Sequence, residues 1–230
     1  MGALRAEDNT RVNTDFIDII QPMDKKEQLK KLEAKIRANA SLPLMESNLV
    51  FGEGNPDCAV MFIGEAPGFH EDQLGRPFVG RAGKLLDQLI TEIGWKREDV
   101  YISNIVKRRP PENRDPLPEE IEVYKPYLAE QIEIINPKII APLGRFSMNY
   151  FLPFAKISRD QGKVFKIGER IVYPLYHPAA ALRNPTVLAD LREAFQKLPD
   201  VAAGKSAGSS LIGDLAAEKT GKSAPQQSLF

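Results

Sequence analysis

The sequence predicts an α/β protein built on a parallel sheet with helices on both faces. Short apolar runs, suited to buried strands, alternate along the chain with longer amphipathic segments, suited to helices. This alternation is typical of parallel sheets whose connecting helices cover both faces. The length of 230 residues and the hydrophobic content of 43% fit one domain with one sizeable core.

The first elements follow from apolar spacing and from proline and glycine. Residues 14–38 carry apolar positions among many charges, which predicts a helix broken near Pro22. Residues 58–64 are almost entirely apolar and predict a buried strand. Residues 82–94 are amphipathic and predict a helix ended by Gly94.

The second half repeats this order. A strand is expected over 100–106, then a helix over 118–135, which begins with proline. A strand over 138–143 is followed by a glycine and a short helix. One or two strands are expected within 164–176, and a last helix over 186–198.

The chain divides into three parts by composition. Residues 1–13 are polar and are expected to be a loose N-terminus, and residues 14–199 to form the folded domain. Residues 200–230 are expected to be a flexible tail, because 200–225 is rich in Gly, Ala, Ser and Lys and has no aromatic residue. Ligands of such sheets bind beyond the carboxyl ends of the strands, so chemistry is expected in the loops after Ile63, Val106, Leu143 and Tyr176.

Composition excludes several classes. The only cysteine, Cys58, makes no disulfide within the chain and cannot by itself supply a zinc or iron–sulfur site. The first residues lack the apolar segment of a signal peptide, and no run has the length of a membrane span, so a cytoplasmic protein is expected. The formal net charge is zero, which leaves DNA binding to a local basic patch.

A glycine-rich loop follows the first strand. It comprises Gly64-Glu-Ala-Pro-Gly-Phe-His-Glu-Asp72 and then Gly75-Arg-Pro-Phe-Val-Gly-Arg-Ala-Gly83. By itself it predicts a turn opening onto a helix N-terminus, where backbone N–H groups can hold a phosphate. Its spacing is neither the Walker nor the dinucleotide-binding pattern.

The whole string closely resembles the family 4 uracil-DNA glycosylases of bacteria and archaea. Later stretches agree in order, namely Tyr101-Ile-Ser-Asn104, Arg109-Pro-Pro-Glu-Asn-Arg114 and His177-Pro-Ala-Ala-Ala-Leu182-Arg-Asn-Pro185. The resemblance covers about residues 25–200. It implies a three-layer α/β/α sandwich around a four-stranded parallel sheet. It also implies an enzyme that flips uracil out of DNA, hydrolyses its N-glycosidic bond and starts base excision repair.

The resemblance implies a role for each motif residue. Phe78 would stack on the flipped uracil, beside the loop residues Gly64 and Ala66. The Asn104 amide would pair with uracil O4 and N3–H and refuse cytosine. His177 would stabilise negative charge on uracil O2, and Glu65 would orient water or balance charge on the sugar.

Other residues are expected to contact the DNA. Leu182 and Arg183 resemble the wedge that fills the space left by a flipped base. Phosphate contacts are expected from Gly68, Arg81, Lys107, Arg109 and Arg114, several of which form a local basic run. His70 could touch the abasic sugar or a phosphate, or could be an ordinary exposed loop residue.

Each residue also has an ordinary structural explanation. A phenylalanine after a proline is usually core, an asparagine after a strand is usually a turn residue, and a loop leucine is usually packing. The glutamate could cap a helix. The ordered match of four motifs favours the functional roles of Phe78, Asn104 and His177 over these alternatives, and it favours those of Glu65 and Leu182 less.

The chain departs from the family at its iron–sulfur cluster. Members typically hold four irons and four sulfurs on four cysteines, and the corresponding positions here fall near Arg37, Ala40, Arg108 and Tyr124. No cofactor is therefore expected. The Arg108 guanidinium over the Tyr124 ring is a candidate replacement for the lost packing.

A related branch traps uracil covalently on a histidine that follows a Lys-Arg-Arg run. This chain has Lys107-Arg-Arg109, but two prolines follow and the histidine is absent. Ordinary turnover is therefore expected.

The C-terminus, Gln226-Gln-Ser-Leu229-Phe230, resembles the short peptides that dock repair proteins on sliding clamps. The expected partners are uracil-containing DNA and a sliding clamp, with a monomer acting at the nucleoid. Two alternatives stay open: a non-catalytic uracil-DNA binder tethered to the clamp, and an unrelated nucleotide-binding α/β protein.

Overall fold

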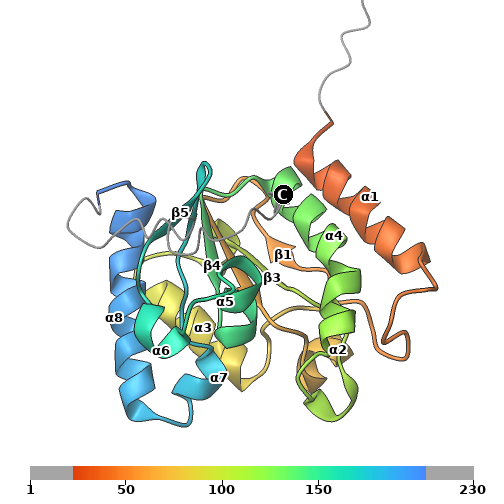
Figure 1. Ribbon diagram of the computed structural model, residues 1–230. Helices are drawn as coiled ribbons and strands as arrows, with labels where there is room; N and C mark the ends of the chain where they lie inside the picture. The colour runs from red at the N-terminus through yellow and green to blue at the C-terminus, as the bar shows by residue number, and fades with distance from the viewer. Residues whose placement is uncertain (1–22, 206–230) are drawn as a thin grey trace, which may run out of the picture.

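Strand β2 (Val60–Gly64) lies at the centre of the sheet, which explains its uninterrupted apolar sequence. The structure is a computed structural model in which residues 23–205 are described (Figure 1). Strand β2 pairs in parallel with β3 (Tyr101–Asn104) on one side and with β4 (Ile139–Pro142) on the other. Every residue of these three strands is buried, as expected for parallel strands covered on both faces.

The sheet has six strands in the order β1-β3-β2-β4-β6-β5. Strand β6 (Arg170–Val172) continues the parallel set beside β4, so four strands run in parallel as expected. Two antiparallel strands form the edges. They are β1 (Glu53–Gly54), beside β3, and β5 (Phe165–Ile167), beside β6. Strand β1 was not expected, because two residues are too few to give a periodic pattern.

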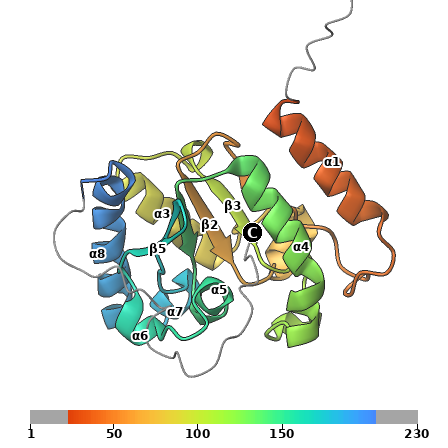
Figure 2. The ribbon, with the colours of Figure 1, turned by 45° about the horizontal axis from the view of Figure 1, so that its top comes forward.

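Helices cover both faces of the sheet (Figure 2). Helices α1 (Lys25–Ala38), α4 (Pro118–Ile135) and α5 (Arg145–Phe151) pack on the face that receives Met61 and Ile63. Helices α3 (Arg81–Glu92) and α8 (Pro185–Ala202) pack on the opposite face, with Val60 and Phe62. Alternate residues of β2 therefore enter two separate cores, and burying each large side chain contributes about 1.5–3 kcal/mol. The predicted three-layer sandwich is confirmed.

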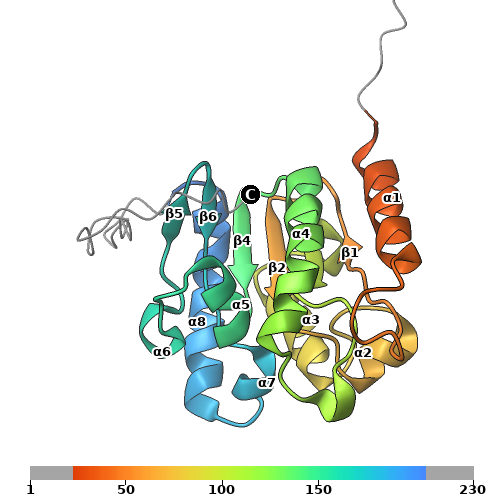
Figure 3. The same ribbon diagram turned by 45° about the vertical axis from the view of Figure 1, so that its right-hand side comes forward.

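Short elements gather at the carboxyl ends of the parallel strands. Helices α2 (Phe69–Leu74) and α7 (Pro178–Ala181) lie at the end of the molecule toward which β4 points (Figure 3). The remaining short helices are η1 (Arg97–Asp99), η2 (Pro111–Asn113) and α6 (Ile157–Asp160). None of the helices within residues 23–205 is long and apolar enough to cross a bilayer.

Helix α8 corrects one predicted boundary. It runs to Ala202, past the predicted helix end at 198 and into the segment assigned to the tail, with Pro199 inside it. Leu198 and Val201 are both buried in the core, and this burial favours continuing the helix although proline lacks an N–H donor. The N-terminal part of the helix expected over 14–38 lies outside the described residues, and α1 begins at Lys25.

Candidate functional site

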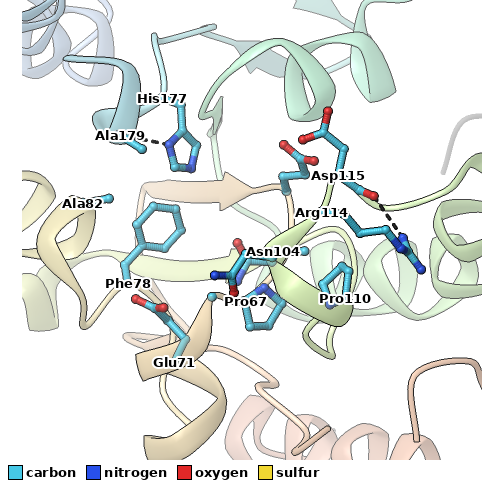
Figure 4. A pocket seen from close by; sticks show the side chains of 14 residues that line it. Pro67, Glu71, Phe78, Ala82, Asn104, Pro110, Arg114, Asp115, His177 and Ala179 are labelled. Carbon is cyan, nitrogen blue, oxygen red and sulfur yellow. Dashed lines mark hydrogen bonds between the residues drawn. The ribbon is translucent and has the colours of Figure 1, made fainter. Parts of the chain in front are cut away.

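A pocket opens where the parallel strands end, as predicted from the topology. It has a volume of about 270 Å³. This volume is near the lower limit of about 300–1,000 Å³ for drug-sized ligands and suits a single small ring. Figure 4 shows Phe78 and His177 on one side, Arg114 and Asp115 on the other, and Asn104 between them. The lining comprises Glu65, Ala66, Pro67, Gly68, Glu71, Phe78, Ala82, Asn104, Pro110, Asn113, Arg114, Asp115, His177 and Ala179.

Asn104 ends strand β3 and presents an unused acceptor. Its side chain is buried, and its Oδ1 atom has no hydrogen-bond partner in the structure. An unpaired buried acceptor is unfavourable by about 1–3 kcal/mol, so it is uncommon in folded proteins unless a ligand completes it. Asn104 is therefore placed to accept a hydrogen bond from a molecule in the pocket.

Phe78 forms a flat apolar wall of the pocket. Its ring centroid lies 5.7 Å from that of His177, with the planes tilted by 34°. Gly64, at the end of β2, keeps the space between Phe78 and Asn104 open. A Cβ atom at Gly64 would come within 2.6 Å of Phe78 Cζ and closer still to Asn104 Oδ1.

His177 precedes α7 and is held in one tautomer. Its Nδ1 atom accepts a hydrogen bond from the Ala179 N–H at 3.1 Å, so the proton of the neutral ring is on Nε2. Burial lowers the pKa of His177 to about 4, although the charge of Glu71 acts in the opposite direction. The ring is therefore neutral at pH 7 and has one N–H to donate. Gly144 allows this placement, since its missing Cβ would lie 2.9 Å from that of His177.

Glu65 follows β2 and lines the same pocket. Burial and the nearby charge of Asp115 raise its pKa to about 7, although the charge of Arg145 acts in the opposite direction. Arg145 pairs at 3.3 Å with Asp115, which lines the pocket. A carboxyl with this pKa can take up or release a proton at neutral pH.

Two charged residues of the lining were not predicted, Glu71 and Asp115. Glu71 Oε1 accepts hydrogen bonds from the N–H groups of Val79 and Gly80, at 2.9 and 2.8 Å, and so fixes the loop that carries Phe78. Glu71 lies inside the glycine-rich string, which could have drawn attention to it. Asp115 lies just beyond the basic run, and no local pattern distinguishes it from an ordinary surface carboxylate.

The predicted DNA-contacting residues fall into groups. Gly68 and Arg114 line the pocket, and Arg114 also forms a bidentate pair with Glu120. Three others, Arg81, Leu182 and Arg183, are exposed. Arg81 is the first residue of α3, and Leu182 and Arg183 lie in the turn after α7.

Arg109 and His70 lie beside the pocket residues. Arg109 is partly buried, with its guanidinium 5.0 Å from the centroid of the Phe69 ring and its Nε atom donating to Asn113. His70 is exposed, and its ring meets that of Phe69 edge-on.

The expectation that Lys107 contacts phosphate is wrong. Lys107 is completely buried, and its Nζ atom donates to Ser103 Oγ, to the Asn104 carbonyl and to Gln131 Oε1, at 2.7, 2.8 and 2.6 Å. All three partners are neutral, and burial lowers the pKa of Lys107 to about 7. The side chain supports the strand end behind Asn104 instead of facing the DNA.

The residues at the family's cluster positions do not fit an iron–sulfur cluster. Arg108 donates to the Ser47 carbonyl, and the Tyr124 hydroxyl donates to the Pro43 carbonyl at 3.0 Å. Burial raises the pKa of Tyr124 to about 12, and the charge of Arg108 acts in the opposite direction, so the two side chains are neighbours, but among the described residues no stacking of the guanidinium on the ring is found. Arg37 pairs with Glu33 on the exposed side of α1, and Ala40 is exposed. None of these groups is a thiolate.

The predicted clamp-binding residues, Gln226, Leu229 and Phe230, lie outside the described residues.

Comparison with known proteins assigns the chain to a family. Residues 51–199 match the family model described as the uracil DNA glycosylase superfamily. A type-4 uracil-DNA glycosylase of Sulfurisphaera tokodaii is 48% identical over 190 residues, which cover 78% of this chain and 86% of that protein. The enzyme of Saccharolobus solfataricus is 50% identical, over 69% of this chain and 78% of that protein. The enzyme of Thermotoga maritima is 46% identical, over 66% of this chain and 84% of that protein.

Proposed function

From its membership of the uracil-DNA glycosylase superfamily, we propose how the pocket of this chain recognises and releases uracil. The chain is a uracil-DNA glycosylase, a hydrolase of DNA repair. The observation that carries the proposal is the buried, unpaired Oδ1 atom of Asn104 in a pocket shared with Phe78 and His177. The base would leave the DNA stack and enter this pocket, since its glycosidic bond is otherwise out of reach.

Recognition would depend on the polarity of one amide. Asn104 Oδ1 accepts from uracil N3–H, and its Nδ2 group donates to uracil O4. Cytosine offers an acceptor at N3 and a donor at the neighbouring amino group, so both contacts would turn repulsive. Phe78 gives the flat ring a stacking surface, and Gly64 leaves room for it.

Release of the base would depend on His177. As the glycosidic bond breaks, its electron pair moves into the uracil ring and negative charge develops on O2. The Nε2–H group of the neutral imidazole can donate to that oxygen, and this hydrogen bond strengthens as the charge grows. Burial in the pocket walls increases the electrostatic benefit, because little water screens it.

Glu65 would act on the sugar side. Its ionised carboxylate can orient the attacking water and balance positive charge on the sugar. Water adds to the sugar carbon as the bond to uracil breaks, and the proton that it gives up neutralises the departing uracil anion, so the products are an abasic site and free uracil. No histidine follows the Lys107–Arg109 run, which supports ordinary turnover over covalent trapping.

The rate of excision is expected to rise with pH through about 7. The reason is that Glu65 must lose its proton to act, and its pKa is raised to about 7. Asp115→Asn removes a charge that raises this pKa and should move the midpoint to lower pH, whereas Arg145→Ala should move it to higher pH. Single-turnover rates between pH 5.5 and 9 measure both shifts, with Asp57→Asn as a distant control. Identical pH profiles for the parent and the three variants would show that ionisation of Glu65 does not control the rate.

We propose that the enzyme works without a metal cofactor. The single cysteine cannot replace four thiolates. Tyr124 ties the loop containing Pro43 and Ser47 to α4, and Arg108 ties the same loop to the segment after β3. Purified protein is expected to be colourless, to contain no stoichiometric iron, and to generate alkali-labile sites in a uracil-containing oligonucleotide. Metal analysis and gel electrophoresis of the same sample test both parts. Visible cluster absorption with matching iron would contradict the absence of a cluster. An uncut oligonucleotide would contradict activity without a metal.

The outer DNA contacts are proposed from exposure and charge. Arg81, Arg114 and Arg183 can approach phosphates around the pocket mouth, and Leu182, 41% exposed, can enter the space left by the flipped base.

We also propose that Gln226–Phe230 binds a sliding clamp, which would keep the enzyme on the nucleoid. The aliphatic–aromatic pair Leu229 and Phe230 suits an apolar clamp pocket. A labelled peptide of this sequence should bind a bacterial or archaeal clamp in fluorescence anisotropy, and Leu229→Ala with Phe230→Ala should abolish binding. Removing the five residues should leave excision from short oligonucleotides unchanged. Binding that survives the double substitution would refute the docking role.

A further inference from the structure

Phe78 adopts a backbone conformation that is unfavourable for its residue type. Its φ angle is +52°, in the left-handed region that large side chains rarely enter. Residues held in such regions persist only where surrounding contacts determine the backbone, and they concentrate at functional sites. The contacts that hold Phe78 are therefore informative about the pocket.

Two side chains of opposite charge hold the peptide groups around Phe78. Arg97 donates to the Pro77 carbonyl at 2.5 Å and to the Phe78 carbonyl at 3.3 Å. On the other side of the turn, Glu71 accepts from the two following N–H groups. The positively charged Arg97 thus binds two carbonyl oxygens, and the negatively charged Glu71 binds two N–H groups. Each charge meets backbone groups of the opposite polarity.

Arg97 is itself fixed by carboxylates from two other elements. Its Nε atom donates to Glu53 on β1 at 2.8 Å, and its Nη1 atom donates to Asp87 on α3 at 2.5 Å. Only 15% of its side chain is exposed. The guanidinium therefore connects the edge strand, helix α3 and the Phe78 turn in one rigid arrangement. An ammonium group has no planar fork to make these contacts together.

The space around Phe78 leaves the ring little freedom. A Cβ atom at Gly83 would overlap the Phe78 carbonyl group, so α3 lies directly behind the turn. In front, the ring borders Gly64 and His177 (Figure 4). A shift of the turn would therefore move the ring into the space that a base has to enter.

We infer that Arg97 is a positioning residue for excision, acting through Phe78. Its guanidinium holds the Phe78 turn in its left-handed conformation and so keeps the stacking face in place. This inference rests on the proposed stacking role of Phe78. Arg97 touches neither the base nor the sugar, and its effect on the rate depends on the ring that it positions.

Arg76 provides a matched control. It also pairs with Glu53, at 2.7 and 3.0 Å, and 58% of its side chain is exposed. Arg76→Ala therefore removes an arginine from the same ionic network and leaves the hydrogen bonds to Pro77 and Phe78 in place.

The test is single-turnover excision from a single-stranded oligonucleotide with one uracil, at saturating enzyme. Arg97→Ala should slow excision by roughly ten- to a hundredfold, the cost of misplacing a reacting group by about an ångström. Arg97→Lys keeps the charge but should stay slow, while Arg76→Ala should remain within about twofold of the parent. Circular dichroism identifies folded variants, and Arg97→Lys carries the test where Arg97→Ala does not fold.

A double-mutant cycle separates positioning from general stability. In a Phe78→Leu background, Arg97→Lys should slow excision by less than about threefold, because the flat ring that Arg97 positions is gone. An equal slowing in both backgrounds, or an Arg76→Ala enzyme as slow as the Arg97 variants, would overturn the inference. A Phe78→Leu enzyme as fast as the parent would instead refute the stacking role, which is a separate outcome.

Discussion

Asn104→Asp is expected to slow uracil excision by about a hundredfold and to weaken the preference for uracil over cytosine. The carboxylate keeps an acceptor for uracil N3–H but has no donor for O4, so two acceptors would face each other in a buried site. Leaving a buried polar group unpaired costs about 1–3 kcal/mol, and 1.4 kcal/mol corresponds to a factor of ten. The burial of the Asn104 side chain is the reason to expect so large an effect, because little water can reach the site to replace the missing donor.

Single-turnover rates on matched uracil and cytosine oligonucleotides measure this change. Asn55→Asp is a suitable control, because Asn55 lies in the loop after β1 and its Oδ1 atom accepts from the Asp57 N–H, which aspartate can also do. An Asn104→Asp enzyme with parental rates and parental discrimination would place base recognition elsewhere in the pocket.

His177→Ala is expected to slow the chemical step by about a hundred- to a thousandfold, the usual effect of removing a donor to a developing oxyanion. DNA binding should change little, because the hydrogen bond gains strength only as charge develops on the base. Since the pKa of His177 is lowered to about 4, the parent ring is neutral throughout the working range. The factor lost should therefore be the same at pH 6 and pH 9.

Rapid-quench rates and fluorescence anisotropy on the same uracil oligonucleotide separate chemistry from binding. The chain's other histidine, His70, is exposed, and His70→Ala serves as a reference for the loss of an imidazole. Weakened binding with an unchanged rate for His177→Ala would contradict the proposed role. So would a factor that is large at pH 6 and falls away by pH 9, since that would indicate a charged imidazole.

Much of the fold was predictable because local patterns and tertiary packing agree. The helix expected over 118–135 matches α4 residue for residue, since Pro118 fixes its start and its apolar positions meet the core. The strand expected over 58–64 contains β2, because a parallel strand buried on both faces is apolar at every position. The loops after Ile63, Val106 and Tyr176 do line the pocket, as their topology required, whereas the fourth predicted loop, after Leu143, contributes no lining residue.

The unpredicted features depend on contacts between residues far apart in sequence. Lys107 belongs to a basic run, which indicates an exposed loop, yet its Nζ atom reaches Gln131 on α4. Likewise Arg97 bonds carbonyl oxygens 19 and 20 residues earlier in the chain. Backbone acceptors have no sequence signature, so such contacts become visible only when the elements are in place.

The short strands at the two edges of the sheet have a consequence for self-association. A parallel sheet left open would expose rows of free N–H and C=O groups to other chains, and a protein with no net charge at pH 7 has little mutual repulsion to keep copies apart. Here β1 offers two residues and β5 three, and β5 carries the exposed Lys166. Neither edge gives an approaching strand enough length to pair, so the molecule is protected from edge-to-edge aggregation by geometry, without depending on charge.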